Sequence, residues 1–332
     1  MTTLKSVAIA VGLASSAFGQ ATSPVVGYET ITLQPGQFNF FGLRFSERTE
    51  ATGQFETGDT TGLSDDEGDF SFVEAGETYL IEFDGGSSIV VPDTNISGSG
   101  VTGVDGTGLA GVDYTIRRVA TLTDVFGENN EAGLQAGTGL DNADVIFLPQ
   151  PDGSFDQVFR NEGLVIGGNV IVPPTWQDAS NNVVDPPLVF TDAILVETQP
   201  GASTTEFVVA GALITSEQAF DLNGGDAFNF LSSIYPVGAT LGNSGLSDSL
   251  TPGTGVDNAD VVFLPRPDGS FDQYFFNPGL VVGGNVLVPP AWQDTANVDS
   301  TNEPLTSGFI VLRRGADTTG VISPPPVVAD LN

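Results

Sequence analysis

The stretch DNADVIFLPQPDGSFDQVFRNEGLVIGGNVIVPPTWQD occupies residues 141–178, and DNADVVFLPRPDGSFDQYFFNPGLVVGGNVLVPPAWQD occupies residues 257–294. At the constant offset between them (257 − 141 = 116), residues 137–178 and 253–294 differ at nine of 42 positions and share the other 33. Strands of similar composition do not converge to such a level of identity. We therefore interpret the two stretches as an internal duplication, and the structure of one copy predicts that of the other.

Each copy predicts a β-hairpin. In the first copy the apolar strand ADVIFLP is followed by Pro151, Asp152 and Gly153, which suit a tight turn, and by SFDQVF, which alternates back. Next, GLVIGGNVIVPP predicts two further short strands joined through Gly167 and Gly168.

The composition extends this pattern to the whole chain. With 42 Gly, 21 Pro and short apolar runs between Gly, Asn and Asp clusters, the sequence is typical of an all-β protein. We predict two homologous antiparallel β-sandwich or barrel-like domains, residues 20–215 and 216–332, joined by the polar DLNGGDA stretch. Residues 47–112, present only in the first half, predict an inserted β segment. Helix is expected only as single turns near 129–134 or 244–250.

The first residues predict an exported protein. MTTLKSVAIAVGLASSAFGQA has one lysine, an apolar run and small residues, which is the pattern of a signal peptide over residues 1–19, with cleavage after Ala21 as the alternative. No later segment has the roughly 18 consecutive apolar residues of a membrane helix, so no transmembrane anchor is expected. We expect the mature protein to be secreted or bound at the cell surface.

Charge and missing residue types exclude several functions. Without Lys5 the mature chain has eight Arg against 42 Asp and Glu (8 − 42 = −34), which argues against a nucleic-acid partner. The absence of His and Cys excludes Ser-His-Asp and Cys-His catalysis and zinc or copper sites built on imidazole. Carboxylates, amides and hydroxyls are the chemistry that remains.

Together these features resemble a known family. The signal peptide, VGYETITLQPG, YTIRRVATLTDVFG, the ADVIFLP…GSFDQVF hairpin, a Trp and ILVETQPGASTTEFVVAGAL are similar to uncharacterised secreted β-rich proteins of Verrucomicrobia. The resemblance covers residues 26–213 and partially continues to 314, and the second copy lacks a clear counterpart of VGYETITL. It implies export and a β-rich fold, and it implies no activity and no site residues.

Two acidic clusters are candidate calcium sites, because they place carboxylate and amide oxygens together around glycine. No cofactor other than Ca²⁺ is suggested. Neither cluster fits an EF-hand loop, and in so acidic a chain solvated turns are the alternative interpretation. The candidate ligands are Asp65, Asp66 and Asp69 in SDDEGD, and Asp221, Asn223 and Asp226 in DLNGGDA. The repeated pairs Asp141 with Asp144 and Asp257 with Asp260 precede strands, and turn closure by their side chains is the predicted role.

Carbohydrate chemistry is the remaining option for a site. A glycosidase needs only two apposed carboxyl groups, and the best nominees are Asp156 with Asp178 and Asp272 with Asp294. Without catalysis, the candidates for stacking on a polysaccharide are Trp176, Trp292, Tyr274 and Phe276. Burial in the core is the alternative for both tryptophans, in equivalent positions of the two halves.

These observations favour a non-enzymatic structural or cell-surface protein, active in adhesion, an envelope or an extracellular assembly. The alternatives are a carbohydrate-binding module and a carboxylate-only glycoside hydrolase. Self-association through β edges is a further expectation. The nearly uncharged segment TSPVVGYETITL, residues 22–33, either pairs within its own domain or adds to the sheet edge of a neighbouring molecule.

Overall fold

In the computed structural model, which describes residues 25–150 and 152–331, the chain is nearly all β and every sheet is antiparallel. The first half contains a five-stranded sheet of order β16-β13-β12-β17-β2 and a three-stranded sheet of order β1-β18-β3. Their bounds are β1 Val26–Leu33, β2 Phe38–Gly42, β3 Phe45–Ser46, β12 Val145–Pro149, β13 Phe155–Asn161, β16 Thr175–Asp178, β17 Ala193–Glu197 and β18 Thr205–Leu213.

The second half repeats this strand order. A five-stranded sheet of order β20-β26-β21-β22-β25 accompanies a two-stranded sheet, β19-β27. The bounds are β19 Gln218–Leu222, β20 Ala227–Ser232, β21 Val261–Pro265, β22 Phe271–Asn277, β25 Ala291–Asp294, β26 Gly308–Arg313 and β27 Thr318–Ile322. Strand β19 pairs with β27 as β1 pairs with β18, so the second half does have an opening strand, although its sequence does not resemble VGYETITL.

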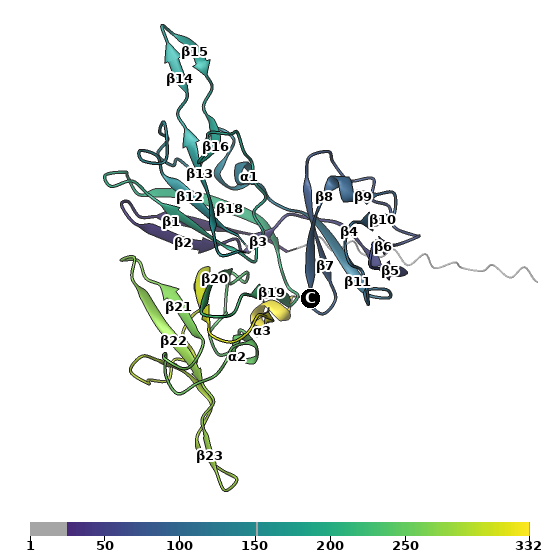
Figure 1. Cartoon of the computed structure of the whole chain (residues 1–332), viewed down its shortest axis with the longest axis vertical. Helices are drawn as coiled ribbons and strands as arrows, with labels where there is room; N and C mark the ends of the chain where they lie inside the picture. The colour runs from purple at the N-terminus through teal and green to yellow at the C-terminus, as the bar shows by residue number, and fades with distance from the viewer. Residues whose placement is uncertain (1–24, 151, 332) are drawn as a thin grey trace, which may run out of the picture.

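The residues inserted in the first half form a body with its own core (Figure 1). Its bounds are β4 Thr49–Gln54, β5 Thr57–Asp59, β6 Gly62–Ser64, β7 Thr78–Phe83, β8 Ser88–Pro92, β9 Ile96–Ser97, β10 Gly100–Thr102 and β11 Asp113–Arg118, with a 3-10 turn at Asp93–Asn95. The strands form two four-stranded sheets around buried Phe55, Tyr79, Ile81 and Ile116. This body ends about six residues beyond the insertion predicted from the sequence.

Alternation along the strands determines the main core. Ile146 and Leu148 of β12 face inward, while Phe147 between them faces away, as the period of two requires. The inward residues of both halves belong to one continuous hydrophobic cluster. The stretch DLNGGDA, which we expected to link two domains, instead forms the end of β19, a turn and the start of β20. That linker prediction was wrong because a polar run also suits a hairpin turn.

The helices are single turns: α1 Leu122–Phe126, α2 Leu246–Ser249 and α3 Pro326–Ala329. The prediction near residues 244–250 is confirmed by α2, whereas residues 129–134 are not helical. Helix α1 begins earlier because Thr121 and Asp124 form a reciprocal capping box. No helix among the described residues is long and apolar enough to cross a membrane. The predicted signal peptide, residues 1–19, lies outside the described residues.

Two thin hairpins project from the ends of the molecule, which we name arm 1 (residues 163–174) and arm 2 (residues 279–290). Arm 1 contains β14 Leu164–Ile166 and β15 Asn169–Val172, and arm 2 contains β23 Leu280–Val282 and β24 Asn285–Val288. In Figure 1 arm 1 extends from the top and arm 2 from the bottom, with the two five-stranded sheets between them.

Candidate functional site

The base of each arm is fixed by an Asn at the end of a core strand. Asn161 accepts a hydrogen bond from the Gly163 backbone N–H at 2.7 Å and donates to the Gln177 side chain at 3.0 Å. Gly163 has a φ of 77°, and a Cβ there would lie 2.5 Å from the Val172 carbonyl oxygen. Only glycine fits at this position, and the chain therefore turns sharply out of the sheet. Asn277 and Gly279 repeat the arrangement in arm 2.

The tips turn through two glycines. In arm 1, Gly167 and Gly168 have φ of 60° and 84°, the left-handed values that two-residue hairpin turns of type I′ require at both positions. The flanking pairs Ile166 with Asn169 and Val165 with Val170 complete a two-stranded ribbon. Local sequence therefore suffices to form each hairpin, but it provides no third strand or second layer.

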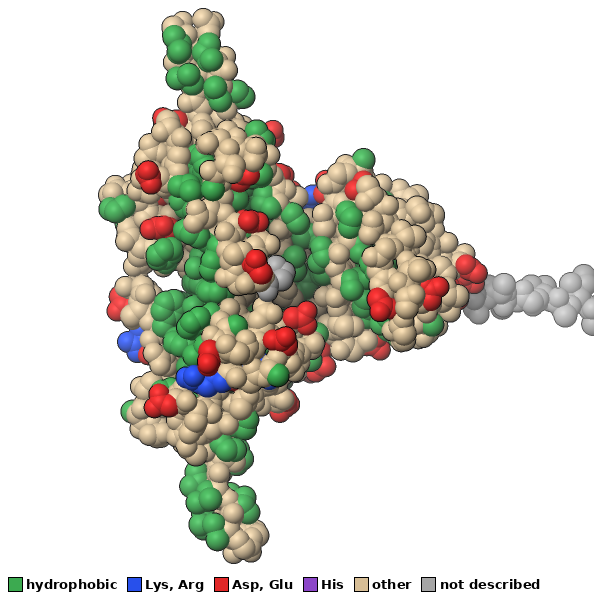
Figure 2. Space-filling model, in the orientation of Figure 1, with side chains coloured by type: hydrophobic (Ala, Val, Ile, Leu, Met, Phe, Trp, Pro, Cys, Tyr) green, Lys and Arg blue, Asp and Glu red, His purple; other side chains and the backbone are tan. Residues whose placement is uncertain are grey.

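All twelve aliphatic side chains of the arm strands are exposed. The fractions run from 38% at Val172 to 62% at Val170 in arm 1, with similar values in arm 2. They are Leu164, Val165, Ile166, Val170, Ile171, Val172, Leu280, Val281, Val282, Val286, Leu287 and Val288. Figure 2 shows apolar side chains along both arms. Neither arm contains a charged residue, so the usual protection of an exposed strand edge by charge is missing.

A second apolar feature lies between the two halves. Eight phenylalanine rings form a continuous row in which neighbouring ring centroids lie 4.8–6.5 Å apart. In spatial order they are Phe38, Phe147, Phe155, Phe230, Phe40, Phe271, Phe263 and Phe228. The row is symmetric about the contact of Phe40 with Phe230, since each half contributes four equivalent rings.

Two clefts flank this row. One, of about 520 Å³, is lined by Phe228 and Phe230 together with the first β-hairpin and Asp192. The other, of about 470 Å³, is lined by Phe38, Phe40 and the second β-hairpin. Burial raises the pKa of Asp192 to about 6. The terminal rings Phe38 and Phe228 remain about half exposed. Aromatic contacts thus join the halves while leaving apolar surface open beside them.

The stacking role predicted for Trp176, Trp292 and Tyr274 was wrong, because all three lie in the core and are at most 6% exposed. The expected burial of both tryptophans in equivalent positions is confirmed: Trp176 pairs with Arg160 across β13 and β16, as Trp292 pairs with Phe276 across β22 and β25. A ring between two layers cannot stack on a ligand in solvent.

The first acidic cluster is tied to protein groups. Asp65 is buried and accepts hydrogen bonds from the Tyr114 hydroxyl at 2.6 Å and from the Glu67 backbone N–H. Hydrogen bonding from Ser71 holds the pKa of Asp69 below its usual value. The backbone N–H of Asp66 donates to Glu56. The carboxylates of Asp65 and Asp69 are therefore engaged by neighbouring protein groups, as in solvated turns.

The second cluster is divided between two structural elements. Asp221 lies on β19 and accepts from the Thr319 hydroxyl, whereas Asp226 lies in the following turn and pairs with Arg314 at 3.2 Å. The Asn223 backbone N–H donates to Asn229. Over residues 25–150 and 152–331, no group of three or more acidic side chains has the geometry to hold a metal ion.

The proposed catalytic carboxyl groups are partly brought together. Asp156 and Asp178 line one open hollow of about 510 Å³. Asp178, however, accepts hydrogen bonds from Ser180 and Asn182, which close a turn, and the Asn182 bonds hold its pKa below the usual value. A general acid needs a raised pKa, so the environment does not suit that role.

In the second half the two corresponding carboxylates also bind protein groups. Asp272 forms an ion pair with Arg266, and Asp294 accepts from the backbone N–H groups of Ala296 and Val298. Asp156, the remaining candidate, accepts a hydrogen bond from the Gln150 side chain at 2.9 Å, so all four carboxylates bind groups of their own hairpins and turns.

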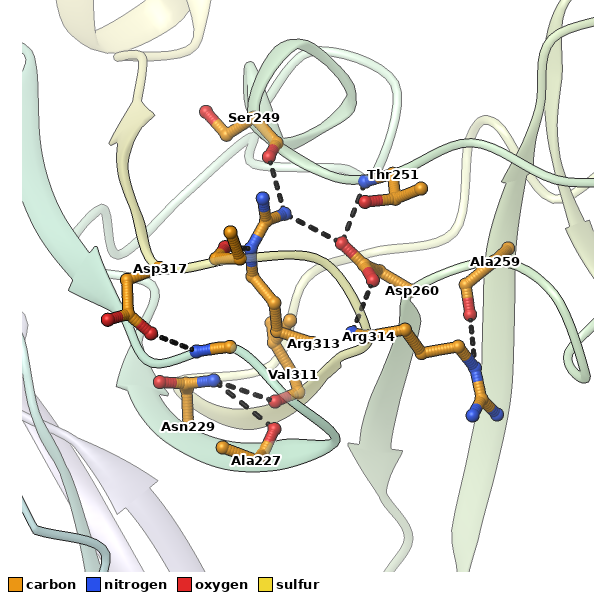
Figure 3. Close-up of polar contacts among 12 residues, drawn as sticks. Ala227, Asn229, Ser249, Thr251, Ala259, Asp260, Val311, Arg313, Arg314 and Asp317 are labelled. Carbon is orange, nitrogen blue, oxygen red and sulfur yellow. Dashed lines mark hydrogen bonds and ion pairs between the residues drawn. The ribbon is translucent and has the colours of Figure 1, made fainter.

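Asp144 and Asp260 were predicted to close local turns, but each joins separate segments of the chain. Asp144 accepts from the backbone N–H groups of Gln135 and Gln199, 9 and 55 residues away. Each aspartate is about 1% exposed. Asp260 accepts from the backbone N–H groups of Thr251 and Arg314 and forms a 2.8 Å ion pair with Arg313 (Figure 3). Beside it, Asn229 donates to the carbonyls of Ala227 and Val311.

No protein-family model, curated protein or solved structure matches the chain. The candidate site is therefore defined by the structure alone. The sequence did predict the strands of the arms, but not that they would stand clear of the body. One signal was present: arm strands are apolar at every position apart from Asn169 and Asn285, whereas a strand on a half-buried sheet alternates.

Proposed function

We propose that the protein is a secreted or cell-surface structural subunit, with no catalytic role, that joins copies of itself through arm 1 and arm 2. The observation that carries this proposal is the pair of exposed, uncharged aliphatic hairpins at opposite ends of the molecule. Apolar patches rimmed by polar surface are typical of interaction sites. The signal-peptide pattern of residues 1–19 supports the location outside the cell.

The chemistry of the rest of the chain supports a structural role. Of the acidic side chains proposed for catalysis, Asp178 and Asp294 close turns and Asp156 and Asp272 bond side chains of their own hairpins, while both tryptophans lie in the core. The segment expected to pair at a sheet edge is strand β1 over residues 26–33, and it pairs along its whole length with β18 of the same half. Exchange of that segment between molecules would require a stable strand to leave its sheet. Strand β1 is the edge strand of that sheet, so its outer edge is a further surface for pairing, whereas the arms have two such edges each and stand clear of the body.

The proposal is tested on the mature chain, residues 20–332, by light scattering and electron microscopy as the salt concentration rises. We expect assemblies that grow with salt, because screening weakens the repulsion between bodies that carry about 34 negative charges while leaving apolar contacts intact. A protein that stays monomeric at high concentration in 1 M NaCl refutes the proposal.

Polysaccharide binding is a second candidate, favoured by the clefts beside the phenylalanine row. Phe38 and Phe228 stand half exposed at its two ends and offer flat surfaces for sugar rings. Electrophoresis through gels containing soluble polysaccharides tests this candidate. A retardation that is lost in the Phe38→Ser/Phe228→Ser variant supports it, and unchanged mobility in every polysaccharide contradicts it.

A further inference from the structure

We infer that the contact between copies is arm to arm: an arm of one molecule pairs along its free strand edges with an arm of a second copy, so that molecules join end to end in unbranched chains. This inference rests on the proposed function and adds to it the partner surface and the valency.

The first step concerns hydrogen bonding. Strands β14 and β15 form a sheet of only two strands, and so do β23 and β24. No other described strand pairs with either ribbon, so each ribbon has two outer edges of unpaired backbone N–H and C=O groups. An unprotected edge of this kind is a template for adding another strand.

The second step concerns why the partner is another arm. Arm 1 reads GLVIGGNVIVPP and arm 2 reads GLVVGGNVLVPP, and they differ only by Ile166 against Val282 and Ile171 against Leu287. Both tips have the same glycine geometry, with φ near 60° and 85°. Either arm therefore presents the same aliphatic surface and the same edges to either arm of a second molecule, and like pairs with like.

The third step concerns charge. The arms are neutral, while the whole chain has 42 acidic side chains against nine basic ones. The four steps from residue 163 to residue 167 span roughly 13 Å at about 3.3 Å per residue. Overlapping arms thus keep two bodies farther apart than the screening length of about 8 Å at physiological salt. An arm inserted into a cleft would instead bring two strongly negative bodies into contact.

The fourth step concerns valency. The arms extend from opposite ends of the long axis, one from each half (Figure 1). A molecule whose two equivalent arms point apart cannot use both arms on a single partner. Contacts that do not form a closed ring add further copies. The expected product is a linear chain of copies.

The experiment disables one arm at a time by placing charges on it. Variant A carries Val165→Glu and Ile171→Glu, variant B carries Val281→Glu and Leu287→Glu, and variant AB carries all four. These side chains are 57–61% exposed, so folding is not expected to change. The matched control, Val183→Glu with Val298→Glu, adds the same charge at exposed positions on the body. Masses are measured by sedimentation velocity in 1 M NaCl, with electron microscopy of the same samples.

The wild type and the control are expected to form chains, variants A and B to stop at dimers, and variant AB to remain monomeric. If A or B forms chains while AB is monomeric, an arm binds the body of its neighbour; the arm-to-arm inference then fails and the proposed function stands. If AB assembles as the wild type does, or the wild type is monomeric, both fail. Loss of assembly in the control overturns the inference, because charge on the body then decides association.

Discussion

The two halves differ in the side chains around one buried aspartate, which precedes the central strand of each five-stranded sheet. Asp144 and Asp260 occupy matching places, and each accepts hydrogen bonds from the backbone N–H groups of two separate segments. In the second half a guanidinium joins the site, since Arg313 lies where the first half has Thr198. The comparison shows that the backbone hydrogen bonds are the common requirement, and that the ion pair is an addition to them.

The tryptophans differ in the same way. Trp176 donates to the Gly127 carbonyl oxygen at 3.0 Å and lies beneath the Arg160 guanidinium, 5.5 Å from its ring centroid. Trp292 packs instead against Phe276, and its indole nitrogen has no hydrogen-bond partner among the described residues. The two tryptophans are therefore equally buried, but only the indole N–H of Trp176 donates a hydrogen bond.

Substituting the buried aspartates is expected to give the largest difference in unfolding free energy between the halves. Asp260→Ala leaves the buried Arg313 without its counter-ion and should cost about 3–5 kcal/mol of unfolding free energy. Asp144→Ala loses hydrogen bonds but leaves no buried cation without a partner. We therefore expect it to lower the unfolding free energy by about 1–3 kcal/mol. Guanidinium unfolding measures both. In Asp260→Ala/Arg313→Thr the excess cost should disappear; equal costs in all three variants contradict the comparison.

The tryptophan comparison predicts a smaller difference. Trp176→Phe leaves the Gly127 carbonyl oxygen without its donor, whereas Trp292→Phe removes a nitrogen that had no partner. We expect Trp176→Phe to cost about 1–2 kcal/mol more than Trp292→Phe. Thermal unfolding of the two variants checks this, and a larger cost for Trp292→Phe refutes it.

Position 192 tests how the junction between the halves responds to pH. Asp192 precedes β17 as Ser307 precedes β26, and burial raises the pKa of Asp192 to about 6. A carboxyl group whose pKa is raised on folding is most favourable to stability below its unfolded pKa of about 4, and that stability is lost as pH rises through 6. Ionisation should therefore cost about 1–2 kcal/mol above pH 6, allowing for partial exposure.

Asp192→Asn removes this ionisation and should be more stable than the wild type at pH 7.5, with the advantage shrinking towards pH 4. The measurement is the difference in melting temperature between variant and wild type across that range, which cancels the titration of the other acids. Asp185→Asn, at an exposed turn-binding carboxylate, is the control. An advantage that is the same at pH 4 and 7.5 rules out titration of Asp192 as its cause.

Calcium should have the smallest effect. The two acidic loops differ in their partners, Tyr114 for Asp65 and Arg314 for Asp226, but both have carboxylates engaged by protein groups. We expect Ca²⁺ and Mg²⁺ to raise the melting temperature equally at matched ionic strength, by screening. An additional rise with calcium alone indicates specific binding to the folded state and restores the calcium-site hypothesis.

The sequence alone determined the all-β class and the paired hairpins. These features follow from local chemistry, namely Asp-Gly turns and alternating polarity. Asp144 and Asp260 were expected to close local turns, but their carboxylates bond backbone N–H groups 9 and 54–55 residues away, which only the tertiary structure brings together. The sequence also limited the available chemistry, because a chain without His or Cys has few catalytic groups. Helix α2 lies within the range predicted, residues 244–250, whereas α1 begins at the capping box of Thr121 and Asp124, before the turn predicted at residues 129–134.

Only the tertiary structure decided which apolar groups are covered. Trp176 and the arm residue Val170 both belong to apolar stretches of one repeat, yet they are 2% and 62% exposed. The first lies against a second layer built from distant residues, and the second has no layer opposite it. The phenylalanine row likewise unites residues 38 to 271, which become neighbours when the halves pack. Burial depends on what stands opposite a side chain, and strands that are remote in sequence supply it.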